Sequence, residues 1–279
     1  MNIVMRRALL LLPFLVAGAL GGAVSASAAS PPAAGERWAL IIGIDHFQGR
    51  TRPNFGAVAD AADFRQALLK SGWADDHIKV LTESAATAGA IRGGLQWLVD
   101  HSGPTSLSVI HYSGHVKQVG STEYLWPHDN AFIADTELAG KVRQLRGQAW
   151  VDISGCEAAG FDEGISAPNR LFTGSSRANE KSYELPDQQQ SVFTLLEIEK
   201  AIVNGEGDAN RDGRVSVQEA FAFAAARAPM ITANQRQGAQ HPVMAGWDGT
   251  PLFLDAVATA PAPAAAAAPA KQCILFLCF

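Results

Sequence analysis

The chain has 279 residues, of which 48% are hydrophobic, and its formal net charge is −5 at pH 7. This length and composition are sufficient for one large or two small domains with a buried core. The mild acidic balance, without blocks of like charge, argues against a nucleic-acid-binding protein. Three cysteines exclude a disulfide scaffold. Two of them lie at the C-terminal end, so Cys156 is the one thiol expected in the globular part.

The N-terminus has the pattern of an export signal. Arg6 and Arg7 precede the apolar run ALLLLPFLVAGALGGAV, and the ASA segment at residues 26–28 fits the small-x-small rule for cleavage. The proline and glycines of this run make it a poor membrane span, so we expect residues 1–29 to be removed rather than kept as an anchor. The sequence therefore predicts a periplasmic, cell-envelope or secreted protein with no stable membrane span after cleavage.

Strand and helix patterns alternate from residue 36 to residue 255. Continuous apolar runs predict buried strands, and apolar residues spaced three or four apart predict helices. The expected elements, in chain order, are strand 36–45, helix 56–72, strand 77–83, helix 87–103, strands 106–115, 147–156 and 169–178, helices 191–205 and 216–228, and strand 250–256. This alternation predicts an α/β fold with a mainly parallel central sheet and helices on both faces.

The composition changes at about residue 256. Alanine and proline dominate 256–279, which predicts a linker or tail, and the chain finishes in QCILFLCF. This apolar end is too short to span a bilayer. Cys273 and Cys278 have three open alternatives, namely a small disulfide, pairing between chains, or no bond.

His115 and Cys156 each follow a predicted strand, and sites in open α/β sheets form at the carboxyl ends of strands. A thiolate is the nucleophilic form of cysteine, and a nearby imidazole can accept the thiol proton and later protonate a leaving amine. Ser113-Gly114 and Ser154-Gly155 are small and leave room for a peptide. The simpler alternative is a buried structural cysteine and a hydrogen-bonded histidine.

VIHYSGH resembles the histidine motif of the caspase and metacaspase peptidases, and WVDISGCEAAG resembles their cysteine motif. ALIIGIDHF, VADAADFRQAL, EYLWPHD and LFTGSSRANEKSYE resemble further segments of the family in the same order, within residues 36–255. The resemblance implies the caspase–haemoglobinase fold and a cysteine endopeptidase acting on protein or peptide substrates without an organic cofactor. It makes Cys156 the nucleophile and His115 the general acid/base, with the N–H groups of Gly114 and Cys156 as the oxyanion hole.

The same resemblance bears on specificity. Asp60 and Ser113 match pocket positions that bind a basic P1 side chain, whereas Ser154 stands where metacaspases usually have an acid. Asp152 lies two residues earlier on the same strand parity, and we expect it to substitute in part. Val116 replaces the glycine that usually follows the histidine. These departures leave open a catalytically inactive, calcium-stabilised module that binds peptides.

DANRDGRVSVQE, residues 208–219, matches the twelve-residue EF-hand calcium loop. The expected ligands are Asp208, Asn210, Asp212, the carbonyl of Arg214, Ser216 and Glu219. Two arginines reduce the local negative charge, so we expect an affinity of about 10⁻⁴–10⁻³ M, as in extracellular modules. Calcium would act as a structural clip between two helices. The alternative is a polar turn that binds no metal.

Two further alternatives remain. His111, His115, His128 and Asp129 could serve a metal hydrolase, but on a strand the first two histidines would stand about 13 Å apart, too far to share one ion. The segment SSRANEKSYELPDQQQ is either a plain surface loop or an inter-subunit loop in which Arg177 or Lys181 is cleaved.

Overall fold

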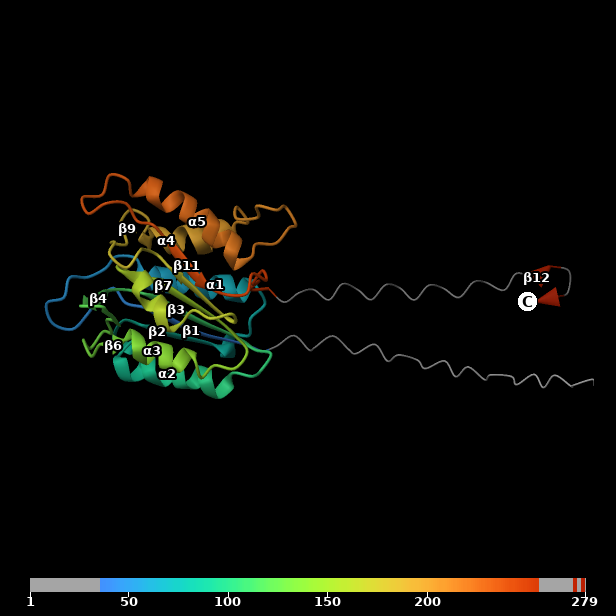
Figure 1. Cartoon of the computed structure of the whole chain (residues 1–279), viewed down its shortest axis with the longest axis horizontal. Helices are drawn as coiled ribbons and strands as arrows, with labels where there is room; N and C mark the ends of the chain where they lie inside the picture. The colour runs from blue at the N-terminus through green and yellow to red at the C-terminus, as the bar shows by residue number, and fades with distance from the viewer. Residues whose placement is uncertain (1–35, 256–272, 275–276, 279) are drawn as a thin grey trace, which may run out of the picture. The chain divides into compact units, whose positions relative to one another are not determined.

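The computed structural model describes residues 36–255, 273–274 and 277–278, and a six-stranded sheet runs through the first range (Figure 1). In spatial order its strands are β11 (Val243–Gly246), β8 (Arg170–Gly174), β7 (Gln148–Ser154), β3 (Leu107–Ser113), β1 (Arg37–Gly43) and β2 (Ile78–Thr82). All neighbours pair in parallel except β11, which is antiparallel to β8 at one edge. The predicted α/β fold with a mainly parallel sheet is confirmed.

Helices cover both faces of this sheet. The longer ones are α1 (Ala57–Lys70), α2 (Ala88–His101), α3 (Asp135–Val142) and α5 (Val217–Ile231), and short 3₁₀ turns are η1 (Asp75–His77), η2 (Glu83–Ala85) and η3 (Ala158–Gly164). Figure 1 shows α2 and α3 below the sheet and α1, α4 (Val192–Thr194) and α5 above it. The connection from α2 to β3 is short, at residues 102–106, whereas that from β1 to α1 spans residues 44–56.

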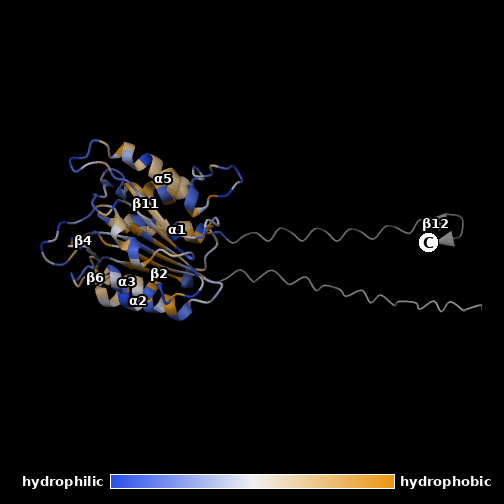
Figure 2. Ribbon diagram, in the orientation of Figure 1, coloured by the Kyte–Doolittle hydropathy of each residue, from blue (hydrophilic) through white to orange (hydrophobic). Residues whose placement is uncertain are grey.

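Alternation along β1 explains why helices are needed on both sides. Leu40 and Ile42 belong to one buried cluster with Leu95 of α2, whereas Ile41 belongs to a second cluster with Phe64 of α1. Successive side chains of a strand point to opposite faces, so an apolar strand leaves both faces to be covered. Figure 2 shows this pattern as apolar central strands between helices whose outer sides are more polar.

Smaller pairings complete the described residues. A three-stranded antiparallel sheet consists of β4 (Val116–Val119), β5 (Thr122–Leu125) and β6 (Ile133–Ala134), and two short antiparallel pairs are β9 (Glu184–Leu185) with β10 (Gln190–Ser191) and β12 (Cys273–Ile274) with β13 (Leu277–Cys278). The last pair places Cys273 opposite Cys278 in the backbone register. The predicted signal segment and most of the tail lie outside the described residues.

The helix expected over residues 191–205 has a different winding. One α turn, α4 (Val192–Thr194), leads into a π-helix, η4 (Leu195–Val203). Apolar spacing predicts that a segment is helical but does not separate α from π winding, and π turns are frequent at functional sites. In η4 the fully buried residues include a carboxylic acid, Glu197.

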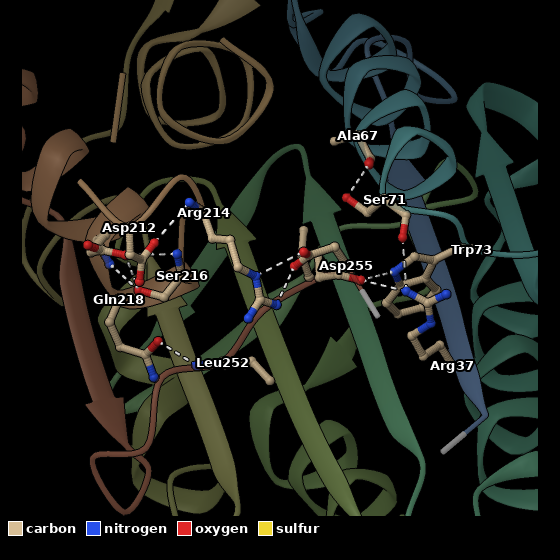
Figure 3. Close-up of polar contacts among 12 residues, drawn as sticks. Arg37, Ala67, Ser71, Trp73, Asp212, Arg214, Ser216, Gln218, Leu252 and Asp255 are labelled. Carbon is tan, nitrogen blue, oxygen red and sulfur yellow. Dashed lines mark hydrogen bonds and ion pairs between the residues drawn. The ribbon is translucent and has the colours of Figure 1, made fainter. Parts of the chain in front are cut away.

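The strand expected over residues 250–256 is not present, and the segment is instead an irregular strap (Figure 3). Its backbone is held by side chains: Gln218 accepts from the N–H of Leu252 at 2.9 Å, and the carbonyl of Leu254 accepts from Trp73 at 2.8 Å and from Arg37 at 2.7 Å. The strap therefore ties α5 to the start of β1. Apolar alternation of Leu252 and Leu254, both buried, imitates a strand pattern.

Candidate active site

Two adjacent parallel strands end at the same edge of the sheet and bring the predicted dyad together. β3 pairs with β7 so that Ser113 stands opposite Ser154, and His115 and Cys156 each follow two residues later. Both residues line a single cleft of about 320 Å³. The carboxyl ends of parallel strands are the usual place for a site in such a fold.

The imidazole of His115 is held on two sides. Its Nε2 lies 2.7 Å from the carbonyl oxygen of Arg52, and its ring stacks on Phe47 at a centroid distance of 4.8 Å. A carbonyl can only accept, so Nε2 carries the proton and Nδ1 of the neutral ring is a proton acceptor. Burial lowers the pKa of His115, and the hydrogen bond to Arg52 partly offsets this effect. The ring is therefore suited to act as a base near neutral pH.

Cys156 has a free thiol that is mostly covered. Its Sγ lies 4.0 Å from the carbonyl oxygen of Ser182, at the limit of a weak sulfur hydrogen bond. Burial raises the pKa of this thiol, while Lys181 lowers it and Glu157 raises it. A raised pKa favours the neutral thiol over the thiolate.

Gly114 does not fit its expected role as an oxyanion donor. Its N–H donates to the carbonyl of Ser154 at 3.1 Å, a bond that continues the ladder between β3 and β7. A donor used in this way is not available to a developing negative charge. The N–H of Cys156 has no acceptor within the described residues and remains available.

Val116 offers a second N–H in this region. The N–H of Trp126 donates to the carbonyl of His115 at 3.2 Å, which makes Val116 and Leu125 a pair without mutual hydrogen bonds in the β4–β5 ladder. The N–H of Val116 therefore points away from β5. The Val116 side chain also packs closely on Gly155, where an added Cβ would lie 2.8 Å from a Val116 methyl group.

Two of the predicted specificity residues, Ser113 and Ser154, line the cleft, and Asp60 lies behind Ser113. Asp60 is fully buried and accepts from the hydroxyl of Ser113 at 2.6 Å and from the N–H of Ser191 at 3.0 Å, and the hydroxyls of Ser154 and Ser191 lie 2.9 Å apart. Burial raises the pKa of Asp60 to about 6, although its hydrogen bonds act in the opposite direction. Asp60 thus stands directly behind the serines that line the cleft.

Asp152 does not reach the cleft, contrary to expectation. Its two oxygens are bonded by His111 and by the hydroxyl of Thr173, each at 2.7 Å, and the side chain is fully buried. Asp152 and Ser154 do lie on the same face of β7, as their spacing of two residues predicts. However, two residues along a strand correspond to about 6.6 Å. Asp152 therefore lies that much farther from the end of β7 than Ser154 does, in the fully buried part of the strand. Burial, and after it the neighbouring Asp152, raises the pKa of Glu197 well above its usual range.

Two charged residues of the following loop were missed by sequence reasoning. Lys181 and Glu184 both line the cleft. Lys181 forms an ion pair with Glu157, which stands directly after Cys156 with a left-handed backbone at φ +51°. Glu184 accepts from the N–H groups of Phe55 and Gly56 at 3.0–3.1 Å. Only the fold brings this loop to the cleft, so no local sequence signal identifies these two residues as site residues.

The 208–219 loop forms the turn that its sequence predicts. Gly213 has φ +84°, and its N–H donates to the carboxylate of Asp208 at 3.0 Å. Ser216 and Glu219 form a capping box at the start of α5. Arg214 is drawn aside by a bidentate ion pair with Asp255 at 2.8 and 3.0 Å (Figure 3). The loop therefore has the sharp turn at its glycine that an EF-hand loop requires.

Among the residues that the structure describes, no three His, Cys, Asp or Glu side chains lie close enough together to form a metal cluster. The carboxylates of the 208–219 loop instead bond its own N–H groups. The four residues considered for a metal hydrolase each have a different hydrogen-bond partner, and that of His115 is the carbonyl of Arg52. His111 bonds Asp152, His128 bonds the carbonyl of His46 at 2.7 Å, and Asp129 caps the start of α2.

A free thiol and an imidazole thus line one cleft at the ends of neighbouring parallel strands of an α/β sheet. A model of the caspase domain, peptidase family C14, matches residues 36–247, and the chain belongs to this family. No helix in the described part of the chain combines the length and apolarity needed to cross a membrane.

Two curated relatives are metacaspases. Metacaspase-1 of Mycosarcoma maydis is 33% identical over 95 residues, and Metacaspase-1 of Eremothecium gossypii is 28% identical over 123 residues; these alignments cover 32% and 37% of this chain. They span 23% and 27% of those relatives, about a quarter of their length.

Two solved structures share the fold. A Geobacter sulfurreducens protein aligns with a TM-score of 0.59 and 15% identity, over 77% of this chain and 95% of its own. Caspase-1 from Spodoptera frugiperda aligns with a TM-score of 0.56 and 11% identity, over 80% of this chain and 90% of its own. At these identities the likeness supports the caspase fold alone.

Proposed function

We propose that this chain is an active cysteine endopeptidase in which Cys156 attacks the substrate and His115 moves the proton. The supporting observation is the bond from Nε2 of His115 to Arg52, which leaves Nδ1 as the acceptor in the cleft that Cys156 also lines. Sγ gives its proton to Nδ1 and bonds the carbonyl carbon of the scissile peptide. The imidazolium then protonates the leaving amine, and water hydrolyses the resulting thioester.

The oxyanion of this reaction would be held by the N–H groups of Cys156 and Val116. The N–H of Gly114 is used by Ser154, whereas these two are free of the neighbouring ladders. Backbone donors aimed at the developing charge lower the barrier without any reorganisation.

A preference for a basic P1 side chain is part of the proposal. Asp60 supports it, because its carboxylate lies behind Ser113 and Ser191 in the lining of the cleft. A guanidinium or ammonium group in the cleft would favour the ionised form of this buried acid.

The second candidate is an inactive peptide-binding module, and one observation favours it. Cys156 is covered, its thiol has a raised pKa, and the carbonyl of Ser182 lies over its sulfur. A binding module would keep the cleft but not the chemistry.

Calcium binding and export complete the proposal. Asp208, Asn210, Asp212, the Arg214 carbonyl, Ser216 and Glu219 would hold Ca²⁺ between η4 and α5 after the loop N–H groups are released. Export rests on the signal pattern of residues 1–29. Sequencing the N-terminus of the secreted product tests it: a start near residue 29 is expected, and an intact N-terminus would contradict it.

The decisive experiment is cleavage of a diverse peptide library by the domain, with and without calcium, beside Cys156→Ala. We expect cleavage that is lost in the variant, with cut sites after arginine or lysine. No cleavage, together with a Cys156 that does not react with an alkylating probe, would favour the binding module.

A further inference from the structure

We infer that Glu184 supplies the second carboxylate that recognises a basic P1 side chain. This inference rests on the proposed peptidase function and its basic preference. Within the described residues, Glu184 is the one carboxylate among those that line the cleft with His115 and Cys156. It would fill the electrostatic role left by Ser154, a residue with no charge.

The Glu184 side chain is fixed in place. The N–H of Phe55 donates to Oε1 at 3.1 Å and to Oε2 at 3.0 Å, and the N–H of Gly56 donates to Oε1 at 3.1 Å. A carboxylate has about four acceptor sites, so these bonds leave capacity for a ligand cation. Three of these sites are used, so one charge-assisted bond from a guanidinium or ammonium group to Oε2 can be added. Glu184 is thus preorganised rather than a mobile surface acid.

The surroundings of Glu184 favour a cationic guest. Burial and the nearby charges of Asp45 and Asp60 raise its pKa, so the site concentrates negative charge that a cation would relieve. Lys181 cannot serve as this cation, because its ammonium group is paired with Glu157. Arg52 also lines the cleft, and its side chain is exposed. Its carbonyl oxygen accepts the hydrogen bond from Nε2 of His115.

The test compares two peptides that differ only at P1, arginine in one and its neutral isostere citrulline in the other. Glu184→Gln keeps the size and one acceptor oxygen but removes the charge. We expect the ratio of kcat/KM for the arginine peptide over the citrulline peptide to fall by roughly 10–100-fold. This is the change in affinity that the loss of one hydrogen bond to a charged group usually causes. Cleavage of the citrulline peptide should change little. Glu163→Gln removes an exposed acid outside the cleft and should leave the ratio unchanged.

Two additional variants separate recognition from anchoring. Ser154→Asp in the Glu184→Gln background should restore much of the arginine preference, because it returns an acid to the floor of the cleft. Glu184→Asp keeps the charge and should retain the preference at comparable folding stability. Equal losses for both peptides, or equal behaviour of the Asp and Gln variants, would mean that Glu184 only anchors the loop and would overturn the inference.

The outcomes also separate the two proposals. A wild-type enzyme that cleaves without preference for arginine would contradict the proposed specificity itself. A wild-type preference that persists in Glu184→Gln would contradict only the role of Glu184.

Discussion

The ring of Phe47 lies stacked on the imidazole of His115, with the two planes inclined by only 15°. Phe47 is 8% exposed, so this packing surface is part of the core. Together with the hydrogen bond to Arg52, it restricts the ring to one orientation, which leaves Nδ1 as the nitrogen not used by Arg52.

Phe47→Leu should therefore reduce catalysis more than stability. The shorter aliphatic side chain lets the imidazole tilt, and small misplacements of catalytic groups are costly, so kcat should fall by about 10-fold or more with little change in KM. Stability should fall by about 1 kcal/mol, because the smaller side chain buries less apolar surface and leaves a small void. Phe132→Leu is the control, because Phe132 packs on Trp126 and not on His115. Equal kcat in both variants would contradict this role of Phe47.

The ion pair of Lys181 and Glu157 should control the reactivity of Cys156. Lys181 lowers and Glu157 raises the pKa of the thiol. Lys181→Met leaves the acid uncompensated and should slow alkylation of Cys156 at pH 7, whereas Glu157→Gln should accelerate it. The rate of labelling by iodoacetamide, followed by mass spectrometry, measures both. Changes of the same sign in the two variants would show that access, rather than charge, governs the thiol.

Asp60 should make the fold less stable as the pH rises. Its pKa is about 6 in the folded protein against 3.8 in the unfolded chain, so the folded state binds the extra proton. The stability from this group is present below pH 3.8 and is lost as the pH rises to about 6, an effect of about 3 kcal/mol. Urea unfolding of the wild type and Asp60→Asn between pH 4 and pH 7 measures it. The difference should shift in favour of the variant with increasing pH, and a constant difference would contradict the prediction.

The same ionisation should appear in substrate selection. Only the charged form of Asp60 attracts a cationic P1 group, so kcat/KM for an arginine peptide should rise relative to a citrulline peptide as the pH passes about 6. Using the ratio of the two peptides removes the titration of His115 from the comparison. A ratio independent of pH between 5 and 7 would exclude Asp60 from P1 recognition.

Calcium should stabilise the wild type by about 1–3 kcal/mol at 10 mM, given an affinity of 10⁻⁴–10⁻³ M. Glu219→Gln should abolish the increase in Tm, because it removes one charged oxygen of the bidentate ligand. Glu206→Gln, an exposed acid just before the loop, should retain it. Magnesium provides a second control. An increase in Tm that is the same in Glu219→Gln would place calcium elsewhere.

The sequence was sufficient for the main elements of the fold, because long apolar runs and helical spacings are strong local signals. The sequence did not predict features that depend on contacts between distant parts of the chain or on the winding of a helix. The last expected strand has the alternating burial of Leu252 and Leu254 but hydrogen-bonds to side chains instead of a strand. The π-helix has the same apolar spacing as an α-helix, so the pattern around Glu197 does not show the difference.

The candidate site was predicted only as far as strand ends and motif resemblance extend. Those signals located His115, Cys156 and Asp60. Strand parity gave the correct face for Asp152 but could not give its depth. Glu184 lies in a loop whose path depends on the fold, so its arrival at the cleft required the structure.

The strap at residues 250–255 brings the two ends of the domain together. Because Arg37 at the start of β1 bonds the carbonyl of Leu254 at 2.7 Å, the two ends of the 36–255 region are neighbours in space. A short Gly/Ser linker could join them, and new termini could open in the exposed turn at residues 187–189. Circular permutation at that turn would cut the chain between the half that contains Cys156 and the half that contains the 208–219 loop. The family architecture would then be reassembled from the same contacts in a different chain order.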